Sequence, residues 1–405
     1  MINTSESKRL LSLDFFRGIT IAAMILVNNP GNWSHVYPPL LHAQWHGWTF
    51  TDLIFPFFLF IVGVSITLAF STKKENKTPP RDLYPKIIRR TLILFALGLF
   101  LNGFPFFDVP AIGIPLDTLT DRTPFDITTM RIPGVLQRIA VCYFVASLLF
   151  LHCGVKVQAL WAVAFMLIYW AVMQWFPVPG VGAGSYAKGA NFSAWVDNLV
   201  LQGHMWSVSK TWDPEGIFST LPAISTTLFG VLTGQLLRQS LPPMKTLLIM
   251  LIGGGTAIAV GFMWSHWLPI NKSLWTSSYA LFMSGMALVV LGVSYYLIDI
   301  KGWRFGVKPF RIYGMNAITV FVLSGVVARL LYLIKWQTGG EVITLKEWLV
   351  NTLFLTWLSP VNASLAFALF FVFLSYLKLL SSKKSKSITL ILASYSSSVS
   401  SSSIG

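Results

Sequence analysis

The sequence predicts an all-α protein that crosses a membrane many times. Hydrophobic residues make up 54% of the 405-residue chain and charged residues only 11%, whereas soluble domains carry about 25% charged residues. The hydrophobic residues gather in runs of about 20, the length of a membrane-spanning helix. Short segments rich in Lys and Arg separate many of these runs, as expected for loops that orient membrane spans.

The apolar runs define about ten spans. Their approximate limits are 14–29, 50–71, 88–105, 134–152, 157–176, 217–237, 246–265, 274–298, 312–334 and 361–380. A further apolar piece, 345–358, is short and interrupted by Lys346 and Glu347, so we interpret it as an interfacial or re-entrant helix. If it did span, the count would be about eleven and the two chain ends would lie on opposite sides.

The distribution of basic residues predicts the orientation of the spans. With about ten spans, Lys and Arg gather on one set of loops, as in the segment 73–90, while the segment 30–50 on the other side contains none. Basic loops stay in the cytoplasm, so we expect both termini to be cytoplasmic. We expect a single transmembrane domain over 1–380 and a Ser/Lys-rich, disordered tail over 381–405.

Other classes of protein fit the sequence less well. The formal net charge of +15 comes mostly from loop residues beside spans, so we predict no nucleic-acid partner. The two cysteines, Cys142 and Cys153, form no CxxC pair, and no metal site is predicted. Lys8 and Arg9 precede the first apolar run, but Asp14 and Arg17 interrupt it, which favours a first span over a removable signal.

Polar residues flank and interrupt the first two spans. The stretch from Tyr37 to Gly63 contains His42 and His46 in an outward loop and Asp52 at the start of the second span. A lone loop histidine is usually only solvated. Here, however, Asp14 and Arg17 lie inside the first span and Asn28 at its outer end. Ionisable groups at such depth usually face a cavity or pathway.

Six stretches of the chain together resemble a known family. They are RLLSLDFFRGITIAAMILVNNPG (9–31), HAQWHGWTFTDLIFPFFLFIVGVSI (42–66), RIPGVLQRIAVCYFVA (131–146), WDPEGIFSTLPAISTTLFGVLTG (212–234), LPINKSLWTSSYALFMSGMAL (268–288) and GMNAITVFV (314–322). Their order and content resemble the heparan-alpha-glucosaminide N-acetyltransferase family with its bacterial relatives. The resemblance extends to about residue 380.

The resemblance implies acetyl transfer from cytoplasmic acetyl-CoA, across the membrane, to the amine of a glucosamine on the far side. It implies that His42 is the active histidine, that Asn28 is its companion, and that the protein is a homodimer. His46 stands at a position that is not histidine in the family pattern, so it is left out of the catalytic set. The chain lacks the long lumenal N-terminal region of the animal enzyme, which favours a bacterial inner-membrane protein.

The residue types suit this chemistry. An ammonium group cannot attack a thioester, so the acceptor needs a base near neutral pH, and imidazole has a suitable pKa. His42 could act as that base or carry the acetyl group as an acyl-imidazole. Asn28 could donate to the developing oxyanion or cap its helix. Asp52 could cap the second span or orient the imidazole.

Further candidates are expected to bind the two substrates. For the phosphates of acetyl-CoA these are Arg17, Arg138 and Arg131, with Asp14 beside Arg17 as a possible structural ion pair. For the sugar they are Asp213, Glu215, Asn271, Lys272 and Trp275, where the "DPEG" residues could also be only a turn before a helix. Asn316 is expected to be a helix-packing amide or part of a central cavity.

Two rival functions remain open from the sequence. An amino-sugar transporter, for example of N-acetylglucosamine, would use the same embedded charges, but the paired, interrupted helices of such folds are not recognisable. An O-acetyltransferase of cell-envelope glycans would keep the chemistry and change the acceptor from an amine to a hydroxyl. A purely structural scaffold would not need Asp14, Arg17 and Arg138 in apolar surroundings.

Overall fold

The computed structural model describes residues 10–106, 126–338 and 340–384. The long helices are α1 (Leu11–Asn28), α2 (Phe50–Glu75), α3 (Tyr84–Gly103), α4 (Val135–His152), α5 (Val155–Trp175), α7 (Thr220–Arg238), α8 (Pro243–Trp264), α9 (Ser277–Tyr295), α11 (Ala317–Leu333) and α13 (Pro360–Lys384). The shorter elements are α6 (Phe192–Leu201), α10 (Val307–Met315), α12 (Leu345–Leu353), the strands β1 (Lys335–Thr338) and β2 (Glu341–Thr344), the one-turn helices η1 (Pro38–Leu40) and η2 (Pro80–Asp82), and the π-helical turn η4 (Tyr296–Ile300) that extends α9. The all-α prediction is confirmed.

Several of the described helices are able to cross a membrane, as expected for a multi-pass membrane protein. Eight of them are long and apolar enough to cross a membrane, and the bent pair α10 and α11 would make a ninth. The predicted span 88–105 corresponds to α3, which has 20 residues. Its first two turns contain Lys86, Arg89 and Arg90, and this helix is not among those apolar enough to cross a membrane. The predicted piece 345–358 forms α12, whose nine residues are too few to cross.

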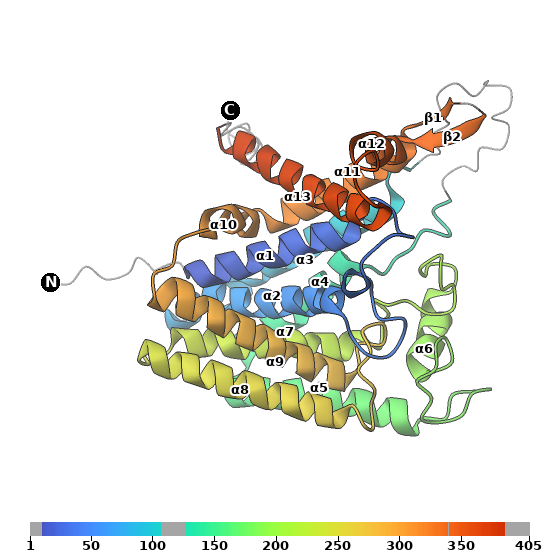
Figure 1. The fold of residues 1–405 in the computed structure, drawn as a ribbon. Helices are drawn as coiled ribbons and strands as arrows, with labels where there is room; N and C mark the ends of the chain where they lie inside the picture. The colour runs from blue at the N-terminus through green and yellow to red at the C-terminus, as the bar shows by residue number, and fades with distance from the viewer. Residues whose placement is uncertain (1–9, 107–125, 339, 385–405) are drawn as a thin grey trace, which may run out of the picture.

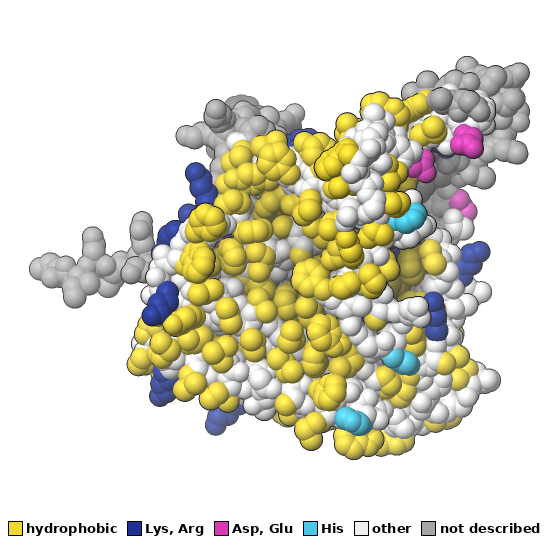
Figure 2. Space-filling view, viewed as in Figure 1, with side chains coloured by type: hydrophobic (Ala, Val, Ile, Leu, Met, Phe, Trp, Pro, Cys, Tyr) yellow, Lys and Arg dark blue, Asp and Glu magenta, His cyan; other side chains and the backbone are white. Residues whose placement is uncertain are grey.

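The long helices lie side by side in one bundle with two distinct ends (Figure 1). At one end of the bundle, α1 begins and α13 ends. We call it the basic end, because many Lys and Arg side chains lie there, next to the hydrophobic surface that covers the middle of the bundle (Figure 2). At the other end, which we call the His42 end, α1 leads into the loop before α2. Both described chain ends lie at the basic end, while its assignment to the cytoplasm stays a prediction. Most of the predicted tail, 385–405, lies outside the described residues.

Glycines allow the central helices to cross at backbone contact. A Cβ atom added to Gly63 of α2 would lie 1.9 Å from the Thr227 carbonyl oxygen of α7, and one added to Gly230 would lie 2.0 Å from the Phe60 oxygen. Only glycine fits at such distances. The crossing follows the small-residue packing of membrane helices, and it fixes α2, which carries Asp52, against α7.

The predicted single span 312–334 is wrong in its first part. The chain bends by 83° between α10 and α11, and Asn316 lies at the bend, where its side chain donates to the Ile312 oxygen. The physical reason is the packing of α10 on α1: Gly314 approaches the Asp14 oxygen so closely that a Cβ would lie 2.0 Å from it. The apolar residues of α10 thus cover α1 instead of extending α11.

Candidate active site

The loop between α1 and α2 brings His42 onto the first turn of α2. Asp52 is the third residue of that helix and is fully buried. One carboxylate oxygen, Oδ2, accepts the backbone N–H groups of Thr49 at 3.0 Å and Ala43 at 3.1 Å. The other, Oδ1, lies 2.6 Å from Nδ1 of His42. The same carboxylate therefore caps the helix and holds the imidazole.

This contact orients the imidazole for proton transfer. A carboxylate can only accept, so Nδ1 of His42 carries the hydrogen, and the lone pair of the neutral ring is on Nε2. The side chain of His42 is 52% exposed, so the imidazole is open to solvent apart from its contact with Lys272. The arrangement provides a base whose tautomer is fixed by a buried acid, as in catalytic triads.

Lys272 lies over this pair. Its Nζ is 3.1 Å from both ring nitrogens of His42 and 3.7 Å from Oδ1 of Asp52. The two ring lone pairs diverge, so equal distances mean that the ammonium lies against the ring and not in line with either lone pair. Burial lowers the pKa of Lys272, an effect that the negative charges of Asp52 and Glu215 only partly offset.

The loop that carries Lys272 is anchored by the other residues predicted there. Asn271 is fully buried, and its side-chain oxygen accepts the N–H of Leu274 at 2.9 Å. Its amide lies 3.4 Å from Nδ1 of His46. Trp275 is 1% exposed and packs against Phe55. As placed here, Trp275 presents no face on which a sugar could stack.

An acid cluster lies at the same end of the bundle. Arg131 donates to both oxygens of Asp213, at 2.9 and 2.6 Å, and to Glu215 at 2.6 Å. Burial alone would lower the pKa of Arg131, but these two carboxylates outweigh it and raise the pKa. Asp197 of α6 accepts the N–H groups of Asp213 and Ile217, which fixes the turn that carries both acids.

Arg138 lies apart from Arg17, although the sequence suggested both as contacts of the acetyl-CoA phosphates. It belongs to the first turn of α4, at the His42 end, where it donates to the Gly216 oxygen at 2.9 Å and to Ser219 at 2.5 Å. It is 2% exposed, and its guanidinium lies over the Trp275 ring. The chain enters α4 from the outer loop, so an arginine in the first turn is far from the basic end.

A large cavity of about 800 Å³ extends inward from the basic end. Its charged lining consists of Asp14, Arg17, Arg90 and Arg238, and Asn316 also lines it. The guanidinium of Arg17 donates to the Ser65 hydroxyl at 2.7 Å. It also donates to Oδ1 of Asp14 and to the backbone oxygen of Gly314, each at 3.4 Å. Asp14 and Arg17 thus form an ion pair with each other and also line the cavity.

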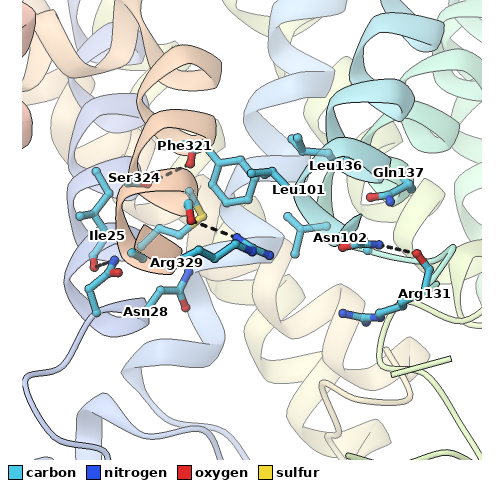
Figure 3. A pocket seen from close by; sticks show the side chains of 17 residues that line it. Ile25, Asn28, Leu101, Asn102, Arg131, Leu136, Gln137, Phe321, Ser324 and Arg329 are labelled. Carbon is cyan, nitrogen blue, oxygen red and sulfur yellow. Dashed lines mark hydrogen bonds between the residues drawn. The ribbon is translucent and has the colours of Figure 1, made fainter. Parts of the chain in front are cut away.

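A smaller cavity of about 250 Å³ lies nearer the His42 end, between α1, α3, α4 and α11. Asn28, Asn102, Arg131, Gln137 and Arg329 line it (Figure 3). Both cavities share Met24, Val135, Leu136 and Phe321 in their walls, so these side chains separate them. His42 lines neither cavity, and Asn28 makes no hydrogen bond with it.

Several lining residues were not singled out from the sequence. Arg329 lies inside an apolar run, the same signal that pointed to Arg17, and could have been found by it. Arg238 is an ordinary span-end residue, while Asn102 and Gln137 carry no distinguishing pattern. In the parts of the chain that the structure describes, no group of three or more His, Cys, Asp or Glu could hold a metal ion.

Comparison with known proteins identifies relatives. Residues 9–250 match the family described as "Heparan-alpha-glucosaminide N-acetyltransferase, catalytic". The human protein named heparan-alpha-glucosaminide N-acetyltransferase is 30% identical over 364 residues, covering 78% of this chain and 52% of its own. The mouse protein of the same name is 27% identical over 387 residues, covering 83% of this chain and 56% of its own. The chain therefore spans about half the length of these relatives.

Proposed function

Because the chain belongs to the heparan-alpha-glucosaminide N-acetyltransferase family, we propose that it is a multi-pass membrane acetyltransferase. It takes the acetyl group of acetyl-CoA at the basic end and transfers it to the amine of a glucosamine-type sugar at the His42 end. The observation that carries this proposal is the 2.6 Å contact between Nδ1 of His42 and the buried Asp52. It leaves Nε2 as an accessible base of fixed tautomer.

His42 manages the proton in this proposal. Nε2 takes a proton from the acceptor ammonium, and the free amine attacks the thioester carbon. The C–N bond forms, the C–S bond breaks, the imidazolium returns the proton to the leaving sulfur of CoA, and the remaining excess proton on the new amide nitrogen leaves to water. In the second route, Nε2 itself attacks the thioester and holds the acetyl group before the amine receives it. The geometry is compatible with both routes.

The large cavity suits the donor. Arg17, Arg90 and Arg238 supply guanidinium groups at the basic end, where the phosphates of CoA would pair with them. The neutral pantetheine arm would follow the apolar wall toward the small cavity. Asn28, whose side chain lines the small cavity, would there donate to the thioester oxyanion.

The orientation and cellular place follow from charge. The basic end would face the cytoplasm, where acetyl-CoA is available, because loops rich in Lys and Arg remain there. The His42 end would then face the periplasm across a bacterial inner membrane. The homodimer implied by the family resemblance remains a prediction.

The test is an incubation of the purified protein with labelled acetyl-CoA and a panel of amino sugars, with free CoA and acetylated product both measured. We expect product and CoA in equal amounts. Omitting the acceptor separates the two routes: an acyl-imidazole releases CoA and labels the protein in a hydroxylamine-sensitive way, whereas a base leaves acetyl-CoA intact. Vesicles that take up the sugar without acetylating it would instead favour the transporter, and acetylation only at hydroxyls would favour the O-acetyltransferase.

A further inference from the structure

The side chain of Lys272 brings a primary amine of the protein to the proposed catalytic base. Its Nζ lies 3.1 Å from Nε2 of His42, and proton transfer needs about 2.6–3.2 Å between the heavy atoms. Its Nζ also lies 3.7 Å from the carboxylate of Asp52, where an acceptor ammonium would form the same ion pair. Lys272 thus occupies the place that the proposed reaction requires for the amine of the acceptor.

The loops that carry Lys272 and His42 are joined to each other. The N–H of Gly47 donates to the Ile270 oxygen at 2.8 Å, and the N–H of Trp275 closes the next turn by donating to the Lys272 oxygen at 3.0 Å. Trp275 has a left-handed φ of 47°, which a non-glycine residue keeps only where its surroundings hold it. The backbone of Lys272 is therefore fixed, while its flexible four-carbon side chain can turn Nζ onto the Nε2 lone pair.

The surroundings favour the neutral, nucleophilic form of this amine. Burial lowers the pKa of Lys272; Asp52 and Glu215 oppose this effect only in part, and the charge of Arg138 adds to it. An amine with a lowered pKa loses its proton more readily near neutral pH. Lysines that are desolvated in this way serve as nucleophiles in enzymes.

We propose that Lys272 is an internal acetyl acceptor, so that the protein acetylates its own Nζ when no sugar is bound. The inference rests on the proposed transferase activity, because it uses the same donor. Nε2 of His42 removes a proton from the Lys272 ammonium, and the free amine attacks the thioester carbon of acetyl-CoA. The C–N bond forms, the C–S bond breaks, and the imidazolium returns its proton to the sulfur of CoA. The excess proton on the new amide nitrogen leaves to water.

Self-acetylation changes the products that are expected without a sugar. A base alone would leave acetyl-CoA intact, but with Lys272 as the acceptor it releases at most one CoA per protein. The acetyl group is then held as an amide, which resists hydroxylamine, whereas an acyl-imidazole is cleaved. Hydroxylamine treatment therefore separates acetyl-Lys272 from acetyl-His42, and Lys272→Arg removes the first of these because a guanidinium stays protonated.

Peptide mass spectrometry tests the proposal. The purified protein is incubated with isotopically labelled acetyl-CoA in the absence of sugar, treated with hydroxylamine and digested. We expect a resistant acetyl group on Lys272 of the wild type. His42→Ala should slow this labelling by about 100- to 10,000-fold, because the base is removed.

Lys188 is the internal control in every sample. It is an exposed lysine of the neighbouring loop, and its Nζ lies over the ring of Trp212, which packs against Trp45. Acetyl-CoA that reacts with lysines without catalysis should label Lys188 at least as fast as the less accessible Lys272. We expect the wild type to label Lys272 much faster than Lys188, and His42→Ala to leave the labelling of Lys188 unchanged.

The possible outcomes separate self-acetylation from the proposed function. Equal labelling of Lys272 and Lys188 in the wild type, or unchanged labelling of Lys272 in His42→Ala, would overturn the proposal. A protein that acetylates amino sugars but leaves Lys272 unlabelled would overturn self-acetylation and uphold the proposed function. His42-dependent labelling of Lys272 in a protein that acetylates no sugar would uphold self-acetylation and count against the proposed acceptor alone.

Discussion

His42 and Asp52 are joined at 2.6 Å by the one carboxylate oxygen that the helix cap leaves free. The nine residues between them run through the loop into the first residues of α2, and Asp52 holds that loop through the Ala43 N–H as well. Capping and imidazole orientation are thus properties of one side chain. A change at Asp52 would alter both the loop and the tautomer of His42.

The first prediction concerns the two loop histidines. His42→Ala should lower the rate of acetyl transfer by about 100- to 10,000-fold, because the base is removed, while leaving the melting temperature and acetyl-CoA binding nearly unchanged. His46→Ala should lower it far less, since His46 contacts the Asn271 amide and the Trp45 ring and not Asp52. The measurement is the initial rate of product formation for both variants. Near-normal transfer by His42→Ala would reduce this histidine to a loop residue.

The second prediction separates two neighbouring amides at the end of α1. Asn28→Ala should slow transfer by about 100- to 1,000-fold if its amide donates to the oxyanion. Asn29→Ala is the matched control: Asn29 is buried and donates to the Ile25 oxygen, so its loss should lower stability more than the rate per folded molecule. Rates normalised to folded protein distinguish the two. Equal rate losses would assign Asn28 a structural role.

The long apolar helices could be predicted because their length and composition alone determine them. The hairpin of β1 and β2 was missed, although Gly339–Gly340 between β-favouring residues is a hairpin signal. The bend at Asn316 carries no such signal, because the run from Ile312 through α11 is mostly apolar and the packing of Gly314 on α1 decides the direction.

The sequence indicates which residues belong to the candidate site, but not which of them contact one another. His42 and Asp52 are close in sequence, so their pairing could be considered. Arg131 and Asp213 are 82 positions apart, and no local pattern indicates that they meet. For the same reason Arg131 was grouped with the donor-binding residues, whereas it is bound to the acids expected at the sugar site.

The third prediction concerns the donor. Arg17→Ala should raise the KM for acetyl-CoA by about ten- to a hundred-fold through the loss of a charge-assisted contact to phosphate, with little change in the KM for the sugar. Arg81→Ala is the control, because Arg81 is at the same end but its side chain is 85% exposed. Steady-state kinetics with each substrate varied in turn gives both constants. A parallel rise in both would indicate that Arg17 serves the fold through Asp14 and Ser65.

The fourth prediction tests the helix crossing. Gly63→Ala places a Cβ 1.9 Å from a backbone oxygen of α7, so the helices must separate, at a cost of about 1–3 kcal/mol or more. Gly255→Ala in α8 meets nothing within 4 Å and should be neutral or slightly stabilising, since alanine favours helices. Melting temperatures in detergent should fall only for Gly63→Ala. An unchanged value there would show that the two backbones are farther apart than described.

The fifth prediction is a pH dependence of stability that originates at Asp197. Burial raises the pKa of this carboxyl from its usual value of 3.8 to about 6, so the folded protein retains a proton that the unfolded chain has lost. The stabilisation is complete below about pH 4 and is lost as the pH rises through about 6. A shift of about two units corresponds to about 3 kcal/mol. Asp197→Asn cannot ionise, so the stability of the wild type relative to this variant should fall by about that amount between pH 4 and 7. Thermal unfolding of both proteins across this range gives the difference, and a difference that stays constant with pH would mean that Asp197 ionises as freely in the fold as in the unfolded chain.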